Sequence, residues 1–70
     1  MNISGIVVKA VPDQAEEVMG TLRASGLCEL HFHDKAGKII VTVKGKDTNE
    51  EIRKMKEIMG LSGVICASLA

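Results

Sequence analysis

Apolar and polar positions follow two different periods, and these periods alternate along the chain. Residues 3–11 are rich in β-branched side chains and stop at Pro12, which cannot continue a central sheet ladder, so a first strand is expected there. Residues 27–34 and 38–44 alternate between apolar and polar positions on either side of a short turn segment, which predicts an antiparallel hairpin. A last short β-rich run covers residues 64–69.

Two other segments have the period of an amphipathic helix. The first is predicted over residues 12–25, where a proline and acidic side chains favour the start and Gly26 suits a left-handed cap at the end. The second should begin at Asp47 or Thr48 and end at Gly60. The apolar stripes expected to enter the core are Ala15, Val18, Met19 and Leu22 in the first helix and Ile52, Met55, Ile58 and Met59 in the second.

The resulting order is βαββαβ, and right-handed crossovers around each helix place the first and third strands in the middle of the sheet. We therefore expect a ferredoxin-like α+β fold, with a four-stranded antiparallel sheet of order 4-1-3-2 and both helices on one face. Seventy residues make one domain, so residues 1–70 are expected to form a single unit.

Strand alternation assigns side chains to the two faces of this sheet. Because Lys9 is costly to bury, its neighbours Val8 and Ala10 should face the helices. The side chains expected under the helices are Ile6, Val8, Ala10, Leu30, Phe32, Ile39, Val41, Ile65 and Leu69. Those expected on the open face are Val7, Lys9, Glu29, His31, His33, Ile40, Thr42, Lys44, Val64, Cys66 and Ser68. An open face with an apolar centre and a polar rim is typical of a binding surface.

Composition argues against several classes of function. Nine basic and nine acidic residues cancel, and Phe32 is the only aromatic residue, so neither a basic field nor a stacking platform for nucleic acid is present. No apolar run reaches the length of a membrane span, and the N-terminus has no export leader, so a cytoplasmic protein is expected.

Catalytic and metal chemistry are not predicted either. No catalytic set can be assembled, and the acidic pairs 16–17 and 50–51 stand at helix starts, where the dipole accounts for them. On a strand Cys28 points away from His31 and His33, so these three do not suit one metal ion. We expect Cys28 and Cys66 to be buried or half-buried thiols, although an intramolecular disulfide is an alternative. The methionines of the helices are expected to fill the core. No enzyme activity, cofactor or metal is therefore expected.

Three segments carry a resemblance to a known family. Ile3-Ser4-Gly5-Ile6-Val7-Val8, Gly26-Leu27-Cys28-Glu29-Leu30 and Gly63-Val64-Ile65-Cys66-Ala67-Ser68-Leu69 resemble the NapD family. The resemblance implies a cytoplasmic, non-enzymatic chaperone. Such a protein binds the twin-arginine signal peptide of the catalytic subunit of periplasmic nitrate reductase, a molybdenum enzyme, and delays export until the cofactor is inserted.

On that hypothesis the signal peptide would lie on the open face as an amphipathic helix. Glu29, and with it Asp34, would meet the arginines. The predicted peptide-binding residues are Val7, Lys9, Glu29, His31, Ile40, Thr42, Val64, Cys66 and Ser68. The first alternative is an ACT-like regulatory module, in which small molecules bind at a dimer interface, and the second is a structural or metal-carrying domain. A homodimer through the open face also stays open.

Overall fold

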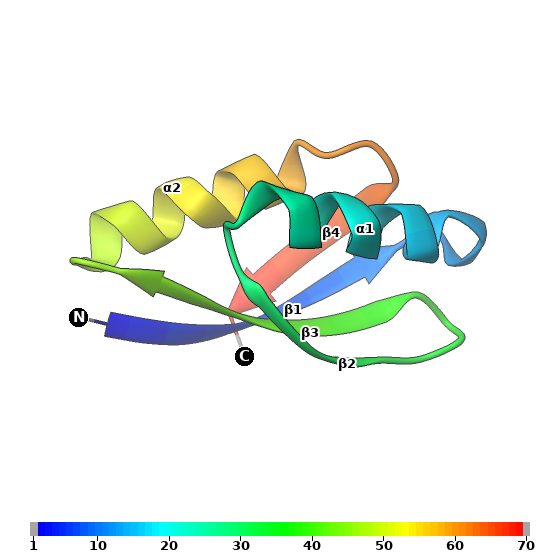
Figure 1. The fold of residues 1–70 in the computed structure, drawn as a ribbon, viewed down its shortest axis with the longest axis horizontal. Coiled ribbons are helices and arrows are strands. Elements are labelled where there is room, and N and C mark those ends of the chain that lie inside the picture. Colours follow the sequence, from blue (N-terminus) through cyan, green and yellow to red (C-terminus); the bar gives the residue numbers. More distant parts are fainter. Residues whose placement is uncertain (1, 70) are drawn as a thin grey trace.

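The structure is a computed structural model that describes residues 2–69, and its elements follow the predicted order (Figure 1). The strands are β1 (Asn2–Ala10), β2 (Glu29–His33), β3 (Lys38–Gly45) and β4 (Val64–Leu69). The helices are the short 3-10 helix η1 (Pro12–Gln14) and the α-helices α1 (Ala15–Ser25) and α2 (Thr48–Met59).

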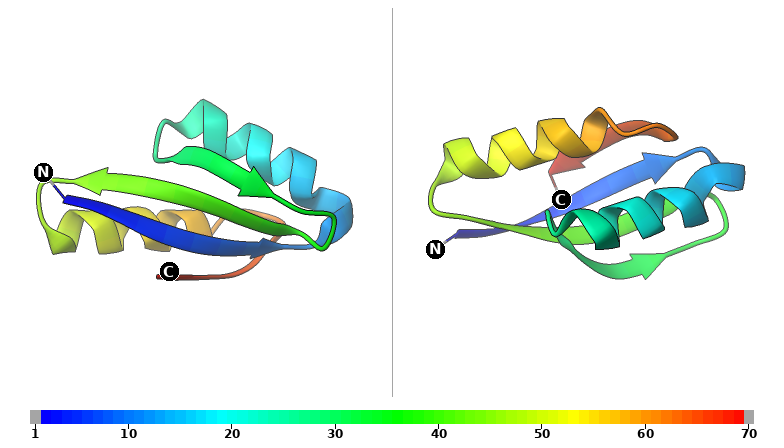
Figure 2. Two further views of the ribbon diagram at one scale, coloured as in Figure 1. Left: turned by 90° about the horizontal axis from the view of Figure 1, so that it is seen from below. Right: turned by 45° about the horizontal axis from the view of Figure 1, so that its top comes forward.

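All strand pairs are antiparallel, and the strands lie in the order β2-β3-β1-β4. This is the predicted order 4-1-3-2 counted from the other edge, so the ferredoxin-like prediction is confirmed. Both helices lie on one side of the sheet (Figures 1 and 2). They enclose one core with the central strands, formed by Ile6, Val8, Ala10, Ala15, Val18, Met19, Leu22, Ile39, Val41, Val43 and Ile58.

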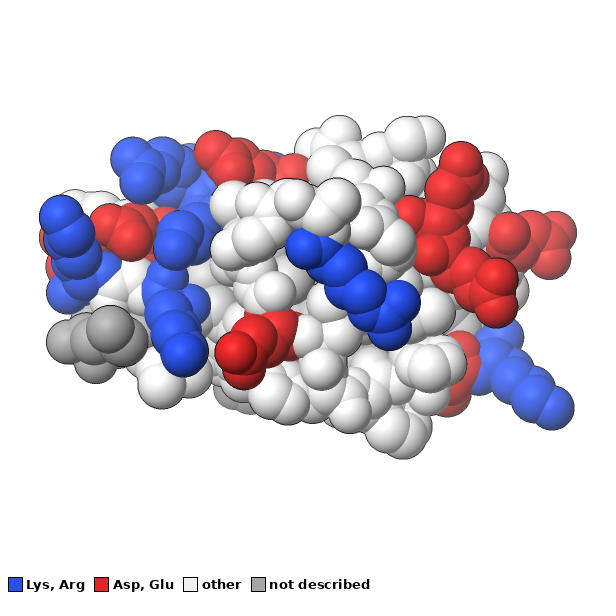
Figure 3. All heavy atoms as spheres, in the orientation of Figure 1, with Lys and Arg blue, Asp and Glu red and all other residues white. Residues whose placement is uncertain are grey.

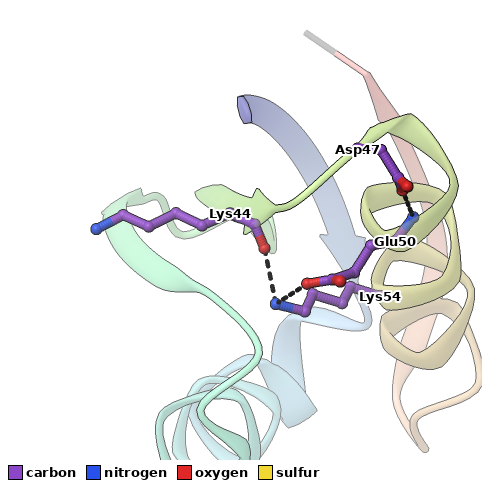
Figure 4. Close-up of polar contacts among 4 residues, drawn as sticks. All are labelled: Lys44, Asp47, Glu50 and Lys54. Carbon is purple, nitrogen blue, oxygen red and sulfur yellow. Dashed lines mark hydrogen bonds and ion pairs between the residues drawn. The ribbon is translucent and has the colours of Figure 1, made fainter. Parts of the chain in front are cut away.

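The ends of the helices follow local signals in the sequence. Pro12 begins a 3-10 turn, and α1 follows it and ends at Gly26, whose φ of 69° is left-handed as expected. Asp47 caps α2, because its side chain accepts a hydrogen bond of 2.9 Å from the backbone N–H of Glu50 (Figure 4). Gly60 ends α2 in a right-handed conformation, with a φ of −82°.

A register shift in β2 corrects the prediction for Phe32. Leu30 lies opposite Val41, but Phe32 lies opposite Ile40, so His31 is one extra residue on this strand. The extra residue reverses the alternation, and Phe32 emerges on the open face with 51% of its surface exposed. The expectation that Phe32 lies under the helices is therefore wrong.

The same shift moves His33 to the other face. His33 lies opposite Ile39, a fully buried residue beneath the helices, and lines a hollow with Met19 of α1. The prediction that His33 belongs to the open face is wrong for the same reason. β2 is an edge strand, so an extra residue there disturbs the ladder on one side only.

The other edge strand, β4, carries a second shift. Cys66 lies opposite Lys9 and Val64 opposite Ala10, which leaves Ile65 as the extra residue. Val64 consequently packs against the core on the helix side, whereas Ile65 is 64% exposed. Both residues were expected on the opposite side, so both predictions are wrong.

Four further residues are more exposed than expected. Leu69 lies opposite Ile6, on the predicted side, yet at the sheet edge it keeps 63% of its surface in solvent. In α2, Ile52 is 38% and Met59 is 47% exposed, because the inward face of the helix is formed by Glu51, Met55 and Ile58. Cys66 is an exposed thiol, contrary to the expectation of burial.

Candidate functional site on the open sheet face

An apolar row crosses the centre of the open face. Val7 of β1 lies opposite Ile40 of β3, and Ile40 lies opposite Phe32 of β2. Val7 and Ile40 are half-buried and Phe32 is exposed, so the row is accessible over three neighbouring strands. On the other side of β1, Ser68 lies opposite Val7 and ends the row with a small polar side chain.

Polar side chains surround one side of this row. His31 Nε2 and Thr42 Oγ1 are 2.8 Å apart and share a hydrogen bond, which holds the extra residue of β2 on the open face. Glu29 lies opposite Thr42 on one side, and Gly5 lies opposite Thr42 on the other. Gly5 therefore adds no side chain to this part of the open face.

The rim of the open face is mainly basic. Lys9 and Lys38 lie directly opposite one another at one end of the β1–β3 pair, and Lys44 lies opposite Ile3 at the other end. Glu29 supplies a carboxylate to this rim, but the three lysines Lys9, Lys38 and Lys44 outnumber it. The open face therefore favours an apolar partner with only limited positive charge next to Glu29.

The structure places almost all the predicted site residues together. Those on the open face are Val7, Lys9, Glu29, His31, Ile40, Thr42, Cys66 and Ser68. Val64 is separated from them and packs under the helices. The prediction missed Phe32, the largest apolar side chain of the row, and gave no role to Lys38. A bulge has no sequence signal of its own, so alternation alone could not find Phe32.

The two thiols differ in environment. Cys28 is half-buried beside the core, and burial raises the pKa of its thiol above the ordinary value. Cys66 is free and exposed on β4, opposite Lys9.

Within residues 2–69, no three His, Cys, Asp or Glu side chains gather as metal ligands. None of the described helices is both long and apolar enough to span a bilayer.

A separate hollow of about 390 Å³ lies where β3 leads into α2, and its lining includes Lys44, Lys46 and Lys54. Lys54 Nζ donates a hydrogen bond of 2.7 Å to the backbone oxygen of Lys44 and lies 3.6 Å from Glu50 Oε1 (Figure 4). The Lys54 ammonium thus ties α2 to the end of β3. Its charge is largely satisfied within the protein.

The net charge of the chain is zero, but the basic and acidic side chains are separated along the molecule. Figure 3 shows Lys and Arg side chains gathered at the end where β3 meets α2, and Asp and Glu side chains gathered at the opposite end. The acidic residues at the start of the first helical segment are Asp13, Glu16 and Glu17. A partner with charge of one sign will therefore distinguish the two ends.

These features define a class: a ferredoxin-like domain whose sheet has one face covered by helices and one bare face with an apolar centre. The family model described as NapD protein matches residues 1–70, so the chain belongs to the NapD family. Among solved structures, it is similar to the solution structure of the E. coli Tat proofreading chaperone protein NapD. That match has a TM-score of 0.90 and 26% sequence identity, and covers 99% of this chain and 74% of the other. A comparison with curated protein sequences found no match.

Proposed function

We propose that this chain is a non-enzymatic, cytoplasmic chaperone that binds a twin-arginine signal peptide on its open sheet face. The peptide belongs to the catalytic subunit of a periplasmic nitrate reductase, and binding delays its export until the molybdenum cofactor is inserted. Membership of the NapD family and the similarity to a Tat proofreading chaperone support this function. The structural observation that carries it is the bare apolar row of Val7, Ile40 and Phe32.

The size of this row suits a helix. It runs from β1 across β3 to β2, which is two strand spacings or about 10 Å. An α-helix with its side chains is about 10–12 Å wide, so one amphipathic helix covers the row with its apolar side. Burial of these half-exposed side chains then supplies the affinity, because each Å² of apolar surface removed from water is worth about 25 cal/mol.

One polar group beside the row offers a specific contact to the peptide. The Glu29 carboxylate can accept two parallel hydrogen bonds from a guanidinium, so it is the contact proposed for an arginine of the peptide. Lysines stand at both ends of the open face, Lys9 and Lys38 at one end and Lys44 at the other, and they limit how much further positive charge the face can hold. Such a complex is small and partly solvated, which suits a chaperone that must release its client.

Isothermal titration calorimetry with a synthetic twin-arginine signal peptide tests this function. Ile40→Asp places a charge in the apolar row and Glu29→Lys reverses the carboxylate, so each should weaken binding by at least about tenfold. Met59→Asp and Glu57→Lys are the matched controls, since they introduce the same two charged side chains at exposed positions of α2. Unchanged binding in both open-face variants would remove the open face from the function. Absence of binding to the wild-type chain would refute the function itself.

A further inference from the structure

Two lysines face each other at one end of the open face. Lys9 of β1 and Lys38 of β3 are direct partners in the antiparallel pair, and both side chains are exposed. Like charges in this position destabilise a sheet. Among the described residues neither ammonium forms an ion pair, since the ion pair there joins Lys54 to Glu50. The lysine pair therefore costs the free chain some stability and leaves two positive charges available to a partner.

The acidic side chains at this end of the molecule belong to the hairpin turn and to the covered side of the sheet. Asp34 accepts hydrogen bonds from two backbone N–H groups in the turn, and it lines a hollow with residues of α1. The others belong to η1 and α1, on the helix-covered side (Figure 1). Salt screens charges over about 8 Å, so these acids act weakly across the sheet. The open-face neighbours of the lysine pair are Val7, Ile40 and Cys66, and none of these carries a carboxylate.

The opposite end of the open face has a different balance of charge. Glu29 and Lys44 line the same hollow of about 170 Å³ there, so the carboxylate offsets this lysine. The apolar row lies between the two ends. The open face thus has unopposed positive charge only at the end that carries Lys9 and Lys38.

We propose that the lysine pair binds the C-terminal end of the signal-peptide helix. The last four backbone carbonyl groups of an α-helix have no partner within the helix, and the helix dipole places about half a negative charge at that end. Two ammonium groups side by side suit these carbonyl oxygens. The inference rests on the function proposed above and adds the direction of the bound peptide, because its cationic start then lies at the Glu29 end.

The length of the open face suits this arrangement. From Thr42 to Lys38, β3 covers four residues, or about 14 Å. An α-helix rises about 1.5 Å per residue, so about nine helical residues span this distance. A helix that runs parallel to the strands over the apolar row therefore has its last turn above the lysine pair.

Calorimetry tests the lysine pair with a twin-arginine peptide that lacks Asp and Glu and is amidated at its C-terminus. The helix end is then the only source of negative charge in the peptide. Lys9→Gln and Lys38→Gln should each raise Kd about two- to fivefold, and neither should lower Tm, because each relieves the repulsion in the free chain. Lys35→Gln is the matched control, since Lys35 is an exposed lysine at the same end but lines the hollow beside α1. Unchanged Kd in both open-face variants, or an equal loss in the control, would overturn the inference.

Paramagnetic NMR on the wild-type chain measures the direction of the peptide independently. Ile65 is exposed on β4 next to Cys66, the partner of Lys9. Ile3 is exposed on β1 and lies opposite Lys44, at the other end. A nitroxide amino acid at the C-terminal end of the peptide helix should broaden the methyl signal of Ile65 and spare Ile3, and one at the N-terminal end should do the reverse. If the peptide binds with any other pattern, the inference is refuted while the proposed function stands. If the wild-type chain does not bind the peptide, both are refuted.

Discussion

Replacement of Phe32 by alanine tests the register shift in β2, because its effects on stability and on peptide binding depend on the face of the sheet on which the ring lies. A phenylalanine inside a core costs about 3–5 kcal/mol when it is cut to alanine. Phe32 instead lies on the open face, opposite Ile40, with 51% of its surface exposed. Its removal should therefore cost little stability and should weaken the binding of a peptide that covers the apolar row.

The magnitude follows from the exposed fraction. Complete burial of a phenylalanine side chain is worth about 1.5–3 kcal/mol, and the folded chain realises about half of this for Phe32. The free energy of unfolding should fall by about 1 kcal/mol. The peptide would bury the remaining half, so the binding free energy should also weaken by about 1 kcal/mol, which is about fivefold in Kd.

Urea denaturation followed by circular dichroism measures the first quantity, and calorimetry with the twin-arginine peptide measures the second. Leu30→Ala is the control, because Leu30 belongs to the same strand but packs against the core under the helices. It should lower the free energy of unfolding by about 2 kcal/mol and leave Kd unchanged. A loss of more than 3 kcal/mol in Phe32→Ala with an unchanged Kd would show that the ring is buried and would refute the assigned register.

Other variants test the rest of the fold in the same denaturation assay. Gly37 has a φ of 92° and its added Cβ would overlap the β1 backbone, so Gly37→Ala should cost more than about 2 kcal/mol. Gly20→Ala, in open space on α1, should gain about 0.5–1 kcal/mol. Asp47→Ala removes the cap of α2 and should cost about 1 kcal/mol, seen as a lower Tm. Cys66 should react with a thiol reagent faster than Cys28, whose folded pKa is raised by burial.

For each of these predictions, a specific result would contradict it. Equal stabilities of the two glycine variants would disprove the tight approach of Gly37 to β1, and an unchanged Tm would show that Asp47 does not cap α2. The raised pKa of Cys28 also has a definite sign: its contribution to stability is complete below the ordinary thiol pKa and is lost as the pH rises through the folded pKa. Faster modification of Cys28 than of Cys66 would reverse the assignment of the buried thiol.

The sequence alone was sufficient for the element order and the helix caps, because these depend on short-range signals. Asp47 caps α2 by contact with a residue three positions away, and Gly26 ends α1 through its own backbone freedom. Apolar spacing likewise predicted which side of α1 is buried. A right-handed crossover then leaves few ways to place the strands, so the open face itself could be predicted.

Tertiary structure decided which side chains that open face carries. Alternation predicts the face of a residue only while each strand keeps its register, and one extra residue reverses it. Such insertions occur at His31 and Ile65, both on edge strands, where pairing on a single side tolerates them. As a result, Phe32 belongs to the open-face site and Val64 does not. The rotation of α2 that buries Glu51 could not be predicted from the sequence either, because it depends on how the helix packs on the sheet rather than on any spacing within the helix.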